Sequence, residues 1–327
     1  MDLHQVYPPL ASLMERVERA LRRAWEGEPE FLAQAAREAL SGPGKRLRPI
    51  LLLLSAECAG GASETSIGLA AIAEMVHAAS LVHDDVIDDA AARRGRASAK
   101  AAWGNKISVL LGDYLISRAF VLAPEEGQQE TLKRLAVVAA RMCHGQVMEL
   151  QAAGHRLEEE EYLGIVRAKT GALFGYCCEA GARSGGASPE VAEALARFGE
   201  RFGVGFQLAD DILDLVGTDG LSGKSEARDL AEGKWTLPLI HAYRAGERAT
   251  RRELLQAMRE RPRARRDIAA VRGLVTATGA VEACWGRVGE WLALARAELA
   301  PVPKSDAKRA LLMVASERFP MPVMVRR

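Results

Sequence analysis

The sequence predicts an all-α fold, and three observations lead to that prediction. Good helix formers, above all alanine, leucine, glutamate and arginine, dominate the 327 residues. Aromatic residues make up only 5% of the chain. Alternating runs of β-branched residues, which are typical of strands, are almost absent. We therefore expect a helical protein.

Glycine and proline divide the chain into successive predicted helices. These run from about Leu10 to Trp25, Glu30 to Leu40, Leu47 to Cys58, Glu64 to Asp89, Lys106 to Leu122, Gln128 to Gln151, Glu158 to Ala182, Pro189 to Val216 and Thr236 to Ala245. The clearest start is Ser188-Pro189-Glu190, with a capping serine, a proline at the first helical position and an acid in the first turn. Shorter helices are expected in the remainder.

The chain is predicted to form a single domain over residues 1–327. It is long enough to bury a large core, no repeat of 20 to 50 residues is evident, and no shift in composition separates two halves. Gly217, Gly220 and Gly223 mark an irregular stretch that begins just after the predicted helix Pro189 to Val216.

Charge and cysteine content exclude several classes of protein. A formal net charge of +1 gives no general reason to bind nucleic acid, and the arginine-rich stretch Arg259 to Arg266 is interpreted as a solvated connection. Five cysteines without paired Cys-x-x-Cys spacing favour a reducing, cytoplasmic protein. We expect no signal peptide and no transmembrane segment, because the apolar run Ile50 to Leu54 is far shorter than the ~20 residues needed to cross a bilayer.

Two aspartate clusters carry the functional prediction. Asp84, Asp85 and Asp88 repeat the Asp-Asp-x-x-Asp spacing of a second cluster, Asp210, Asp211 and Asp214. Residues three or four apart share one face of a helix, so the acids of each cluster should repel one another unless a cation lies between them. One such cluster alone could be a solvated helix end, but two matching clusters favour metal binding.

The type of ligand predicts the type of metal and substrate. Carboxylate oxygens suit Mg²⁺, which binds one or two carboxylates, keeps several waters and takes phosphate oxygens for the rest of its shell. We therefore predict a phosphate ester or diphosphate substrate. Neither a Ser-His-Asp nor a Cys-His arrangement is evident, so no side-chain nucleophile is expected.

Basic residues near predicted helix ends could bind the same substrate. Lys45 and Arg48 open the helix that follows Gly42-Pro43, where backbone N–H groups favour an anion. Arg93 and Arg94 follow the first acidic helix, and arginine suits phosphate because its guanidinium group binds two oxygens at once. Three further candidates are His77, Lys224 and Lys234. Each is weak alone, and a lone helical histidine such as His77 is more often a packed residue.

In order and spacing these residues resemble the trans-isoprenyl diphosphate synthases, also called polyprenyl synthetases. The resemblance rests on both aspartate motifs and on Gly44-Lys45-Arg46-Leu47-Arg48-Pro49, His77, Arg93-Arg94-Gly95, Gly112-Asp113, Gly145-Gln146, Lys169-Thr170-Gly171, Phe206-Gln207, Gly223-Lys224 and Gly233-Lys234-x-Thr236-Leu237-Pro238. The sequence departs from the family pattern at Ala97, Lys100, Ser225 and Ala227, which affects loop geometry more than ligands.

The resemblance implies a helical bundle around a central active-site cavity, and a role for each matching residue. Isopentenyl diphosphate would be bound by Lys45, Arg48, His77 and Arg94. The allylic diphosphate would be bound by Arg93, Lys169, Thr170, Gln207, Lys224 and Lys234, with Lys169 and Lys224 also assigned to catalysis. The six aspartates, Asp84, Asp85, Asp88, Asp210, Asp211 and Asp214, would hold three Mg²⁺ ions together with the diphosphate. The resemblance also implies a homodimer.

By the same resemblance, the allylic diphosphate ionises and the double bond of isopentenyl diphosphate attacks the resulting cation. Val76, Ala79 and Ser80 lie one to two turns before Asp84, and short-product members of the family typically place an aromatic side chain at the positions of Ala79 or Ser80. Their small size predicts an open tunnel and a medium- or long-chain product. Closure deeper down, by Met75, Phe120 or Met148, would instead give a geranylgeranyl-length or farnesyl-length product.

Three other functions compete with this interpretation. A terpene cyclase would usually have a different second metal motif, and a non-catalytic subunit of a heteromeric synthase would typically lose aspartates. A purely structural helical protein would have no reason to keep both clusters and the cationic positions.

Overall fold

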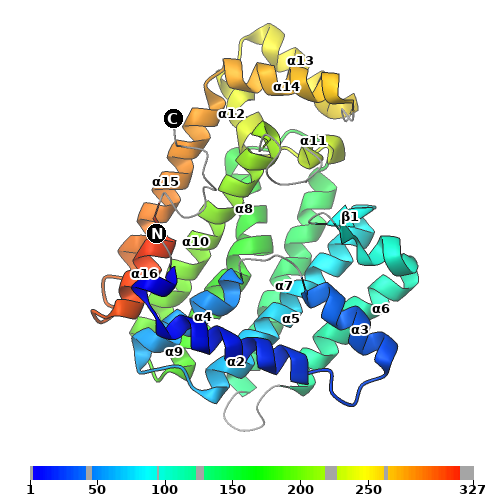
Figure 1. The fold of residues 1–327 in the computed structure, drawn as a ribbon. Coiled ribbons are helices and arrows are strands. Elements are labelled where there is room, and N and C mark those ends of the chain that lie inside the picture. The colour runs from blue at the N-terminus through cyan, green and yellow to red at the C-terminus, as the bar shows by residue number, and fades with distance from the viewer. Residues whose placement is uncertain are drawn as a thin grey trace. The chain divides into compact units, whose positions relative to one another are not determined.

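The computed structural model describes residues 3–41, 46–93, 96–122, 129–217, 227–260 and 264–316. Its helices are α1 (Leu3–Val6), α2 (Pro9–Arg23), α3 (Glu30–Leu40), α4 (Leu47–Ala59), α5 (Glu64–Ile87), α6 (Ala99–Val121), α7 (Gln129–Ala152), α8 (Glu159–Val166), the π-helix Arg167–Gly171, α9 (Ala172–Ser184), α10 (Pro189–Val216), α11 (Arg228–Glu232), α12 (Leu237–Ala245), α13 (Arg248–Glu260), α14 (Arg265–Ala277), α15 (Ala280–Glu298) and α16 (Asp306–Val314) (Figure 1). The all-α prediction is confirmed.

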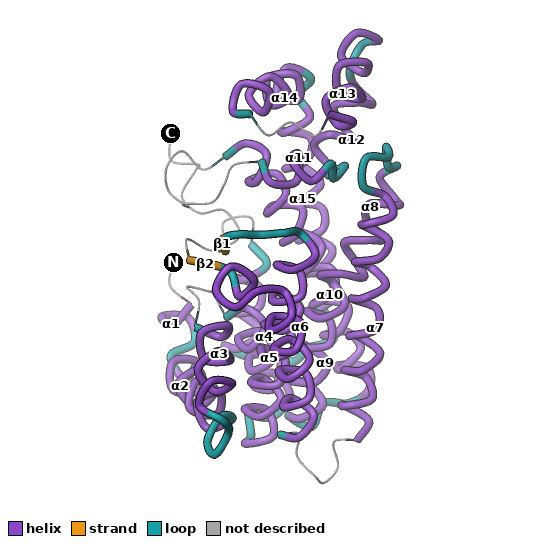
Figure 2. Tube along the Cα trace, turned by 90° about the vertical axis from the view of Figure 1, so that its right-hand side faces the viewer, coloured by secondary structure: helices purple, strands orange, loops and turns teal. Residues whose placement is uncertain are grey.

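A short ribbon of two strands follows α5 and was not predicted. Strands β1 (Ala92–Arg93) and β2 (Arg96–Ala97) are antiparallel, with Ala92 opposite Ala97 (Figure 2). The ribbon reverses the chain between α5 and α6. Two-residue strands carry no periodic signal, so sequence patterns cannot reveal them.

Several helices differ in extent from the predicted ones, among them α5, α6 and the predicted helix from Glu158 to Ala182. Helix α5 ends at Ile87, so that Asp88 is its C-cap and Asp89 has a positive φ of 54°. Helix α6 begins at Ala99, because the Ser98 side chain caps the backbone N–H of Ala101 at 3.0 Å, but Gly104 with φ 77° interrupts it two residues before the predicted start at Lys106. The predicted helix from Glu158 to Ala182 is interrupted by the π-helix Arg167–Gly171.

The chain divides into two compact units. The first contains Met1–Ala139, Leu173–Gly199 and Glu298–Val314, and the second contains Ala140–Ala172, Glu200–Ala297 and Ala315–Arg327. Each unit draws on separate stretches of sequence, which no shift in composition indicates. The single-domain assignment stays a prediction.

Helix α5 is the central element of the first unit. It contacts α2, α3, α4 and α6 (Figures 1 and 2). By length and composition it could cross a membrane, but 72% of its most apolar window is buried inside the protein. Because the core helix of a soluble protein meets the same criterion, this single helix is weak evidence for a membrane span.

Arg46 organises the start of α4 in the first unit. It adopts a left-handed conformation with φ 47° at the N-cap of α4. Its guanidinium group donates to Glu18 at 2.9 Å, to Glu74 at 2.6 Å and to the Leu40 carbonyl at 2.7 Å. These bonds join α2, α3 and α5 at the point where α4 begins, and so they fix the first turn of α4, which carries Arg48.

The second unit is organised around Glu159 at the start of α8. Its carboxylate accepts hydrogen bonds from Arg287 of α15 at 2.9 Å and from Arg244 of α12 at 2.8 Å, and it contacts His241 at 3.2 Å. Gly205 of α10 allows a close approach to α15, since a Cβ atom there would lie 3.2 Å from the Leu292 side chain. These contacts hold α8, α10, α12 and α15 in one unit.

Candidate active site

The first aspartate cluster lies at the C-terminal end of α5. Asp84 and Asp88 are half-buried, whereas Asp85 is only 3% exposed. One residue advances the helix by about 100°, so Asp85 points to a different face from Asp84. The spacing in the sequence does not distinguish the three acids, but the structure does. Asp84 and Asp88 are the more accessible pair.

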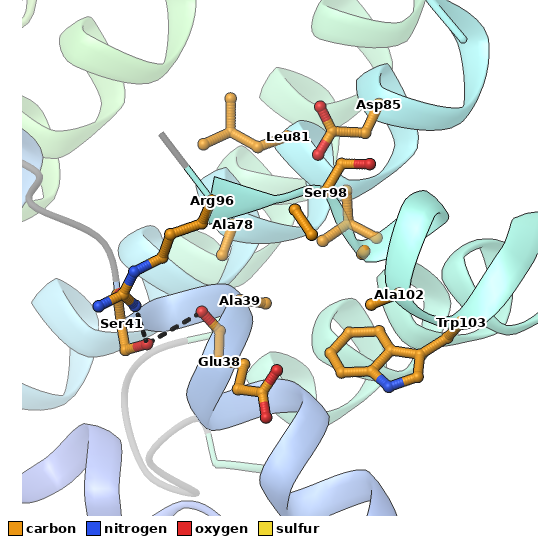
Figure 3. Close-up of a pocket in the computed structure, with 13 residues that line it drawn as sticks. Glu38, Ala39, Ser41, Ala78, Leu81, Asp85, Arg96, Ser98, Ala102 and Trp103 are labelled. Atoms are coloured by element: carbon orange, nitrogen blue, oxygen red, sulfur yellow. Dashed lines mark hydrogen bonds between the residues drawn. The ribbon is translucent and has the colours of Figure 1, made fainter. Parts of the chain in front are cut away.

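Asp85 lines a cavity of ≈ 330 Å³ within the first unit. Figure 3 shows Glu38, Ala39 and Ser41 of α3 and the following turn, Ala102 and Trp103 of α6, and Asp85 and Leu81 of α5 around it. Arg96 donates a hydrogen bond to the Ser41 carbonyl at 2.9 Å and so joins β2 to the end of α3 (Figure 3).

The predicted chain-length residues lie elsewhere on α5 and do not line this cavity. Val76 and Ala79 are buried, at 5% and 0% exposure. Ser80 is half-buried, and its hydroxyl donates to the His77 carbonyl at 2.8 Å. The open tunnel stays a prediction.

The predicted isopentenyl diphosphate residues are described only in part. Arg48 is half-buried in the first turn of α4, with its guanidinium carbon 4.5 Å from the centre of the Phe174 ring. His77 is half-buried on α5. Lys45, Arg94 and the Arg93 side chain lie outside the described residues, although the backbone of Arg93 belongs to β1.

In the second cluster, Asp210 is exposed and Asp214 half-buried, but Asp211 is only 7% exposed. Both carboxylate oxygens of Asp211 accept hydrogen bonds, Oδ2 from the Tyr162 hydroxyl at 2.6 Å and Oδ1 from the Gln207 amide at 2.7 Å. Burial raises the pKa of Asp211 to about 7, against the opposing effect of these two bonds. Asp211 is thus held by protein donors on both of its carboxylate oxygens.

Helix α11 returns the chain to Asp214. The backbone N–H of Asp229 donates to Asp214 Oδ2 at 3.1 Å. Burial, together with repulsion by Asp214 and Asp211, raises the pKa of the Asp229 carboxyl well above its usual value. Several acids therefore gather where a cation would relieve their repulsion. Lys224 lies outside the described residues.

Two predicted lysines converge on one acid that the sequence analysis did not select. Glu149 of α7 accepts a hydrogen bond from Lys169 of the π-helix at 2.5 Å and contacts Lys234 at 3.2 Å. Burial alone would raise the pKa of Glu149, but Lys234 and Lys169 more than offset it and hold the pKa below its usual value. Lys234 also pairs with Glu232 at 2.6 Å. The cluster therefore places two cations side by side.

The Gly145-Gln146 pair of α7 lies against the π-helix. A Cβ atom on Gly145 would lie 2.9 Å from the Lys169 backbone nitrogen, so only glycine permits this approach. Gln146 is 9% exposed, and neither amide atom has a hydrogen-bond partner in the described part of the protein. A buried amide without a partner is unfavourable, and such a group often marks a missing water or ligand.

The donor set fits a hard divalent cation. In the described ranges no three His, Cys, Asp or Glu side chains already form a metal-binding group. The accessible carboxylates Asp84, Asp88, Asp210 and Asp214 offer only oxygen ligands. A cation bound by either pair would complete its shell with water and substrate oxygens, as Mg²⁺ ordinarily does.

Sequence reasoning missed Glu149, Tyr162 and Asp229. Glu149 follows the Gly145-Gln146 pair by three residues, and that position on α7 was the one available signal. Tyr162 and Asp229 contact the second cluster from 49 and 15 residues away in sequence. No local pattern encodes such contacts.

Comparison with known proteins gives the family. Residues 29–275 match the family model described as polyprenyl synthetase. The chain belongs to the polyprenyl synthetase family. It is 34% identical to a short chain isoprenyl diphosphate synthase from Methanothermobacter thermautotrophicus, over 96% of both chains. It is 35% identical to an all-trans-nonaprenyl-diphosphate synthase from Rhodobacter capsulatus, over 94% of both chains.

A solved structure supports the same family and fold. The crystal structure of a polyprenyl synthase from Caulobacter crescentus, complexed with calcium and isoprenyl diphosphate, has a TM-score of 0.91 and 33% identity. It covers 98% of this chain and 97% of that one. The resemblance drawn from the sequence motifs is therefore confirmed at the level of family and fold.

Proposed function

We propose that this polyprenyl synthetase condenses isopentenyl diphosphate with an allylic diphosphate and makes a medium- or long-chain polyprenyl diphosphate. Two complete Asp-Asp-x-x-Asp motifs in one member of this family are the observation that carries the proposal. Intact motifs argue against a non-catalytic partner subunit. Relatives named for both short and nonaprenyl products match the chain, so a farnesyl or geranylgeranyl product is the alternative.

In this proposal the protein binds and orients two diphosphates. Lys169 and Lys234, together with Arg93, Thr170, Gln207 and Lys224, hold the allylic diphosphate, while Lys45, Arg48, His77 and Arg94 hold isopentenyl diphosphate. The convergence of two lysines on Glu149 supports the first assignment, because two adjacent cations suit a diphosphate group. Lys45, Lys224, Arg94 and the Arg93 side chain lie outside the described residues.

We propose Mg²⁺ as the cofactor, bound by aspartates of both clusters. When bound, it neutralises the diphosphate as a leaving group. Asp84, Asp88, Asp210 and Asp214 are the accessible ligands, and Asp85 and Asp211 complete the two motifs. Three ions with the diphosphate would match the expectation from the family resemblance.

We also propose a homodimer in a reducing, cytoplasmic setting. The outer surface of α6 supports the dimer, since its exposed apolar side chains include Val109, Leu110 and Val121, which are 42%, 60% and 69% exposed. All five cysteines are free. Sedimentation equilibrium would test the dimer, and Leu110→Glu is expected to weaken it.

Prenyl transfer can be tested directly. Purified protein, labelled isopentenyl diphosphate, each common allylic primer and Mg²⁺ are incubated together, and the dephosphorylated products are separated by chromatography. Products longer than twenty carbons that disappear in Asp84→Ala would support the proposal. The control is Asp306→Ala, because this surface carboxylate pairs with nearby Arg309 in α16 at 2.7 Å and should not affect activity.

A stop at fifteen or twenty carbons would support the alternative product. Absence of condensation with every primer would overturn the proposal and favour a non-catalytic subunit.

A further inference from the structure

A continuous chain of hydrogen bonds joins the π-helix to the second aspartate motif. The Thr170 hydroxyl donates to Gln207 Oε1 at 2.9 Å, the Gln207 amide donates to Asp211 Oδ1 at 2.7 Å, and Asp211 Oδ2 accepts from Tyr162 at 2.6 Å. These side chains come from α8, the π-helix and α10 of the second unit. Tyr162 stands at the end of this chain.

Burial makes these bonds important. Tyr162 is 4% exposed, Thr170 8% and Asp211 7%. A buried carboxylate without hydrogen-bond donors is strongly unfavourable, and bonds to a charged acceptor contribute more than neutral ones. With one donor on each oxygen and an exposure of only 7%, Asp211 is stabilised in its inward orientation and is shielded from a hydrated cation.

The inward position of Asp211 has a consequence for its neighbours on α10. Asp210 and Asp214 are four residues apart, share one face and remain accessible. Because Asp211 lies about 100° around the helix from Asp210, anchoring Asp211 fixes the rotation at which that face is presented. At the other end of this series of hydrogen bonds, Thr170 belongs to the five-residue π-helix that also carries Lys169. Single π-turns are frequent at functional sites.

We infer that Tyr162 is a positioning residue of the active site, which acts by holding Asp211 as an internal anchor while Asp210 and Asp214 stay on the accessible face that binds the metal. The inference rests on the proposed function, because it concerns the metal and diphosphate of that reaction. Through the same hydrogen bonds, Tyr162 links the rotation of α10 at the second aspartate motif to the position of the π-helix that carries Lys169.

The first test counts metal ions and needs no prenyl transfer. Binding of Mn²⁺ in the presence of inorganic pyrophosphate is followed by electron paramagnetic resonance of the free ion, up to saturation. Tyr162→Phe and Asp211→Asn are expected to keep the wild-type number of ions, while Asp210→Asn loses one. Residues that orient a metal site without contacting the metal typically contribute this much, so Tyr162→Phe should weaken Mn²⁺ affinity roughly 10–100-fold.

Tyr176→Phe is the matched control. Tyr176 is also buried, at 3% exposure, but its hydroxyl has no hydrogen-bond partner in the described part of the protein and lies in the first unit. Removal of this hydroxyl should leave Mn²⁺ binding unchanged. Thr170→Val interrupts the same hydrogen-bond chain at its opposite end and should reproduce the weaker Mn²⁺ affinity if Tyr162→Phe does not fold.

The second test separates positioning from simple destabilisation. Tyr162→Phe should raise the Mg²⁺ concentration needed for half-maximal rate and the KM for the allylic diphosphate, with the KM for isopentenyl diphosphate unchanged. A variant that is only less stable would have a lower apparent kcat, because a smaller fraction of the protein is active. Its Mg²⁺ concentration for half-maximal rate and its KM values for both diphosphates would equal those of the wild type.

Two results would overturn the inference. One is loss of a bound ion in Asp211→Asn, as in Asp210→Asn, which would make Asp211 a metal ligand. The other is wild-type Mn²⁺ affinity in both Tyr162→Phe and Thr170→Val. An inactive wild type that still binds Mn²⁺ and pyrophosphate as expected would count against prenyl transfer alone, so the two failures are distinguishable.

Discussion

Replacing Glu149 by glutamine should destabilise the protein in a way that pyrophosphate reverses. Glu149 contacts Lys169 at 2.5 Å and Lys234 at 3.2 Å, and the three side chains are only 19%, 24% and 16% exposed. In Glu149→Gln the two lysines lose the acid between them. An anion that binds both should then replace the missing charge.

The size of the effect follows from the partners that remain. Removing one member of a buried ion pair costs about 3–5 kcal/mol. Lys234 keeps Glu232 at 2.6 Å, and the side chains are partly exposed, so we expect a loss of about 2–3 kcal/mol in the free energy of unfolding. Freed from competition with Glu149, the lysines should bind pyrophosphate about tenfold more tightly, equivalent to about 1.4 kcal/mol.

Thermal unfolding with and without inorganic pyrophosphate, at constant Mg²⁺, measures both quantities. Without pyrophosphate the variant should melt roughly 3–6 °C below the wild type. With pyrophosphate the difference in melting temperature between Glu149→Gln and the wild type should decrease, because a ligand stabilises more the protein that binds it more tightly.

Glu179→Gln is the control for this experiment. Glu179 likewise lies between two cations, Arg134 at 2.7 Å and Arg183 at 2.9 Å, with a side chain that is 14% exposed, but it belongs to the first unit. Glu179→Gln should lose a similar free energy of unfolding, and pyrophosphate should not reverse that loss. If pyrophosphate stabilises Glu149→Gln no more than the wild type, the two lysines do not form an anion site and the reasoning fails.

Three other predictions test the fold and the product. Ser80→Phe should shorten the prenyl product in chromatography, because the half-buried Ser80 has room that a fully buried position lacks; an unchanged product would mean that this part of α5 does not line the tail. Gly181→Ala should lower the free energy of unfolding by about 3 kcal/mol or more in chemical denaturation, since its Cβ would lie 2.0 Å from the Leu52 carbonyl oxygen, whereas Gly286→Ala, with nothing within 4 Å, should not. The pKa of Glu159 is depressed, with cationic partners overcoming the effect of burial. Its contribution to stability is therefore present above the ordinary carboxyl pKa and lost as the pH falls through the lower folded-state value, so the gap in melting temperature between wild type and Glu159→Gln should be constant near neutral pH and close in acid.

Local patterns explain what could be predicted from the sequence. Helix formers, capping residues and glycine or proline breaks act over a few residues, and they gave most helices with errors of a few positions at their ends. The Asp-Asp-x-x-Asp spacing is equally local, because one turn of helix fixes which acids are neighbours. The same is true of Ser188-Pro189-Glu190, which marks the start of α10 as predicted.

Tertiary packing alone decided how the individual acids differ. Asp85 and Asp211 are buried while Asp84 and Asp210 remain more accessible, although each pair is adjacent in sequence. The partners that determine this are distant: Tyr162 is 49 residues from Asp211, and Lys169 is 20 residues from Glu149. The sequence by itself thus determined the helices and the composition of the site, since both follow from short-range geometry. Only the tertiary structure decided which carboxylates are anchored, because that depends on which helices pack together and which donors their contact brings within reach.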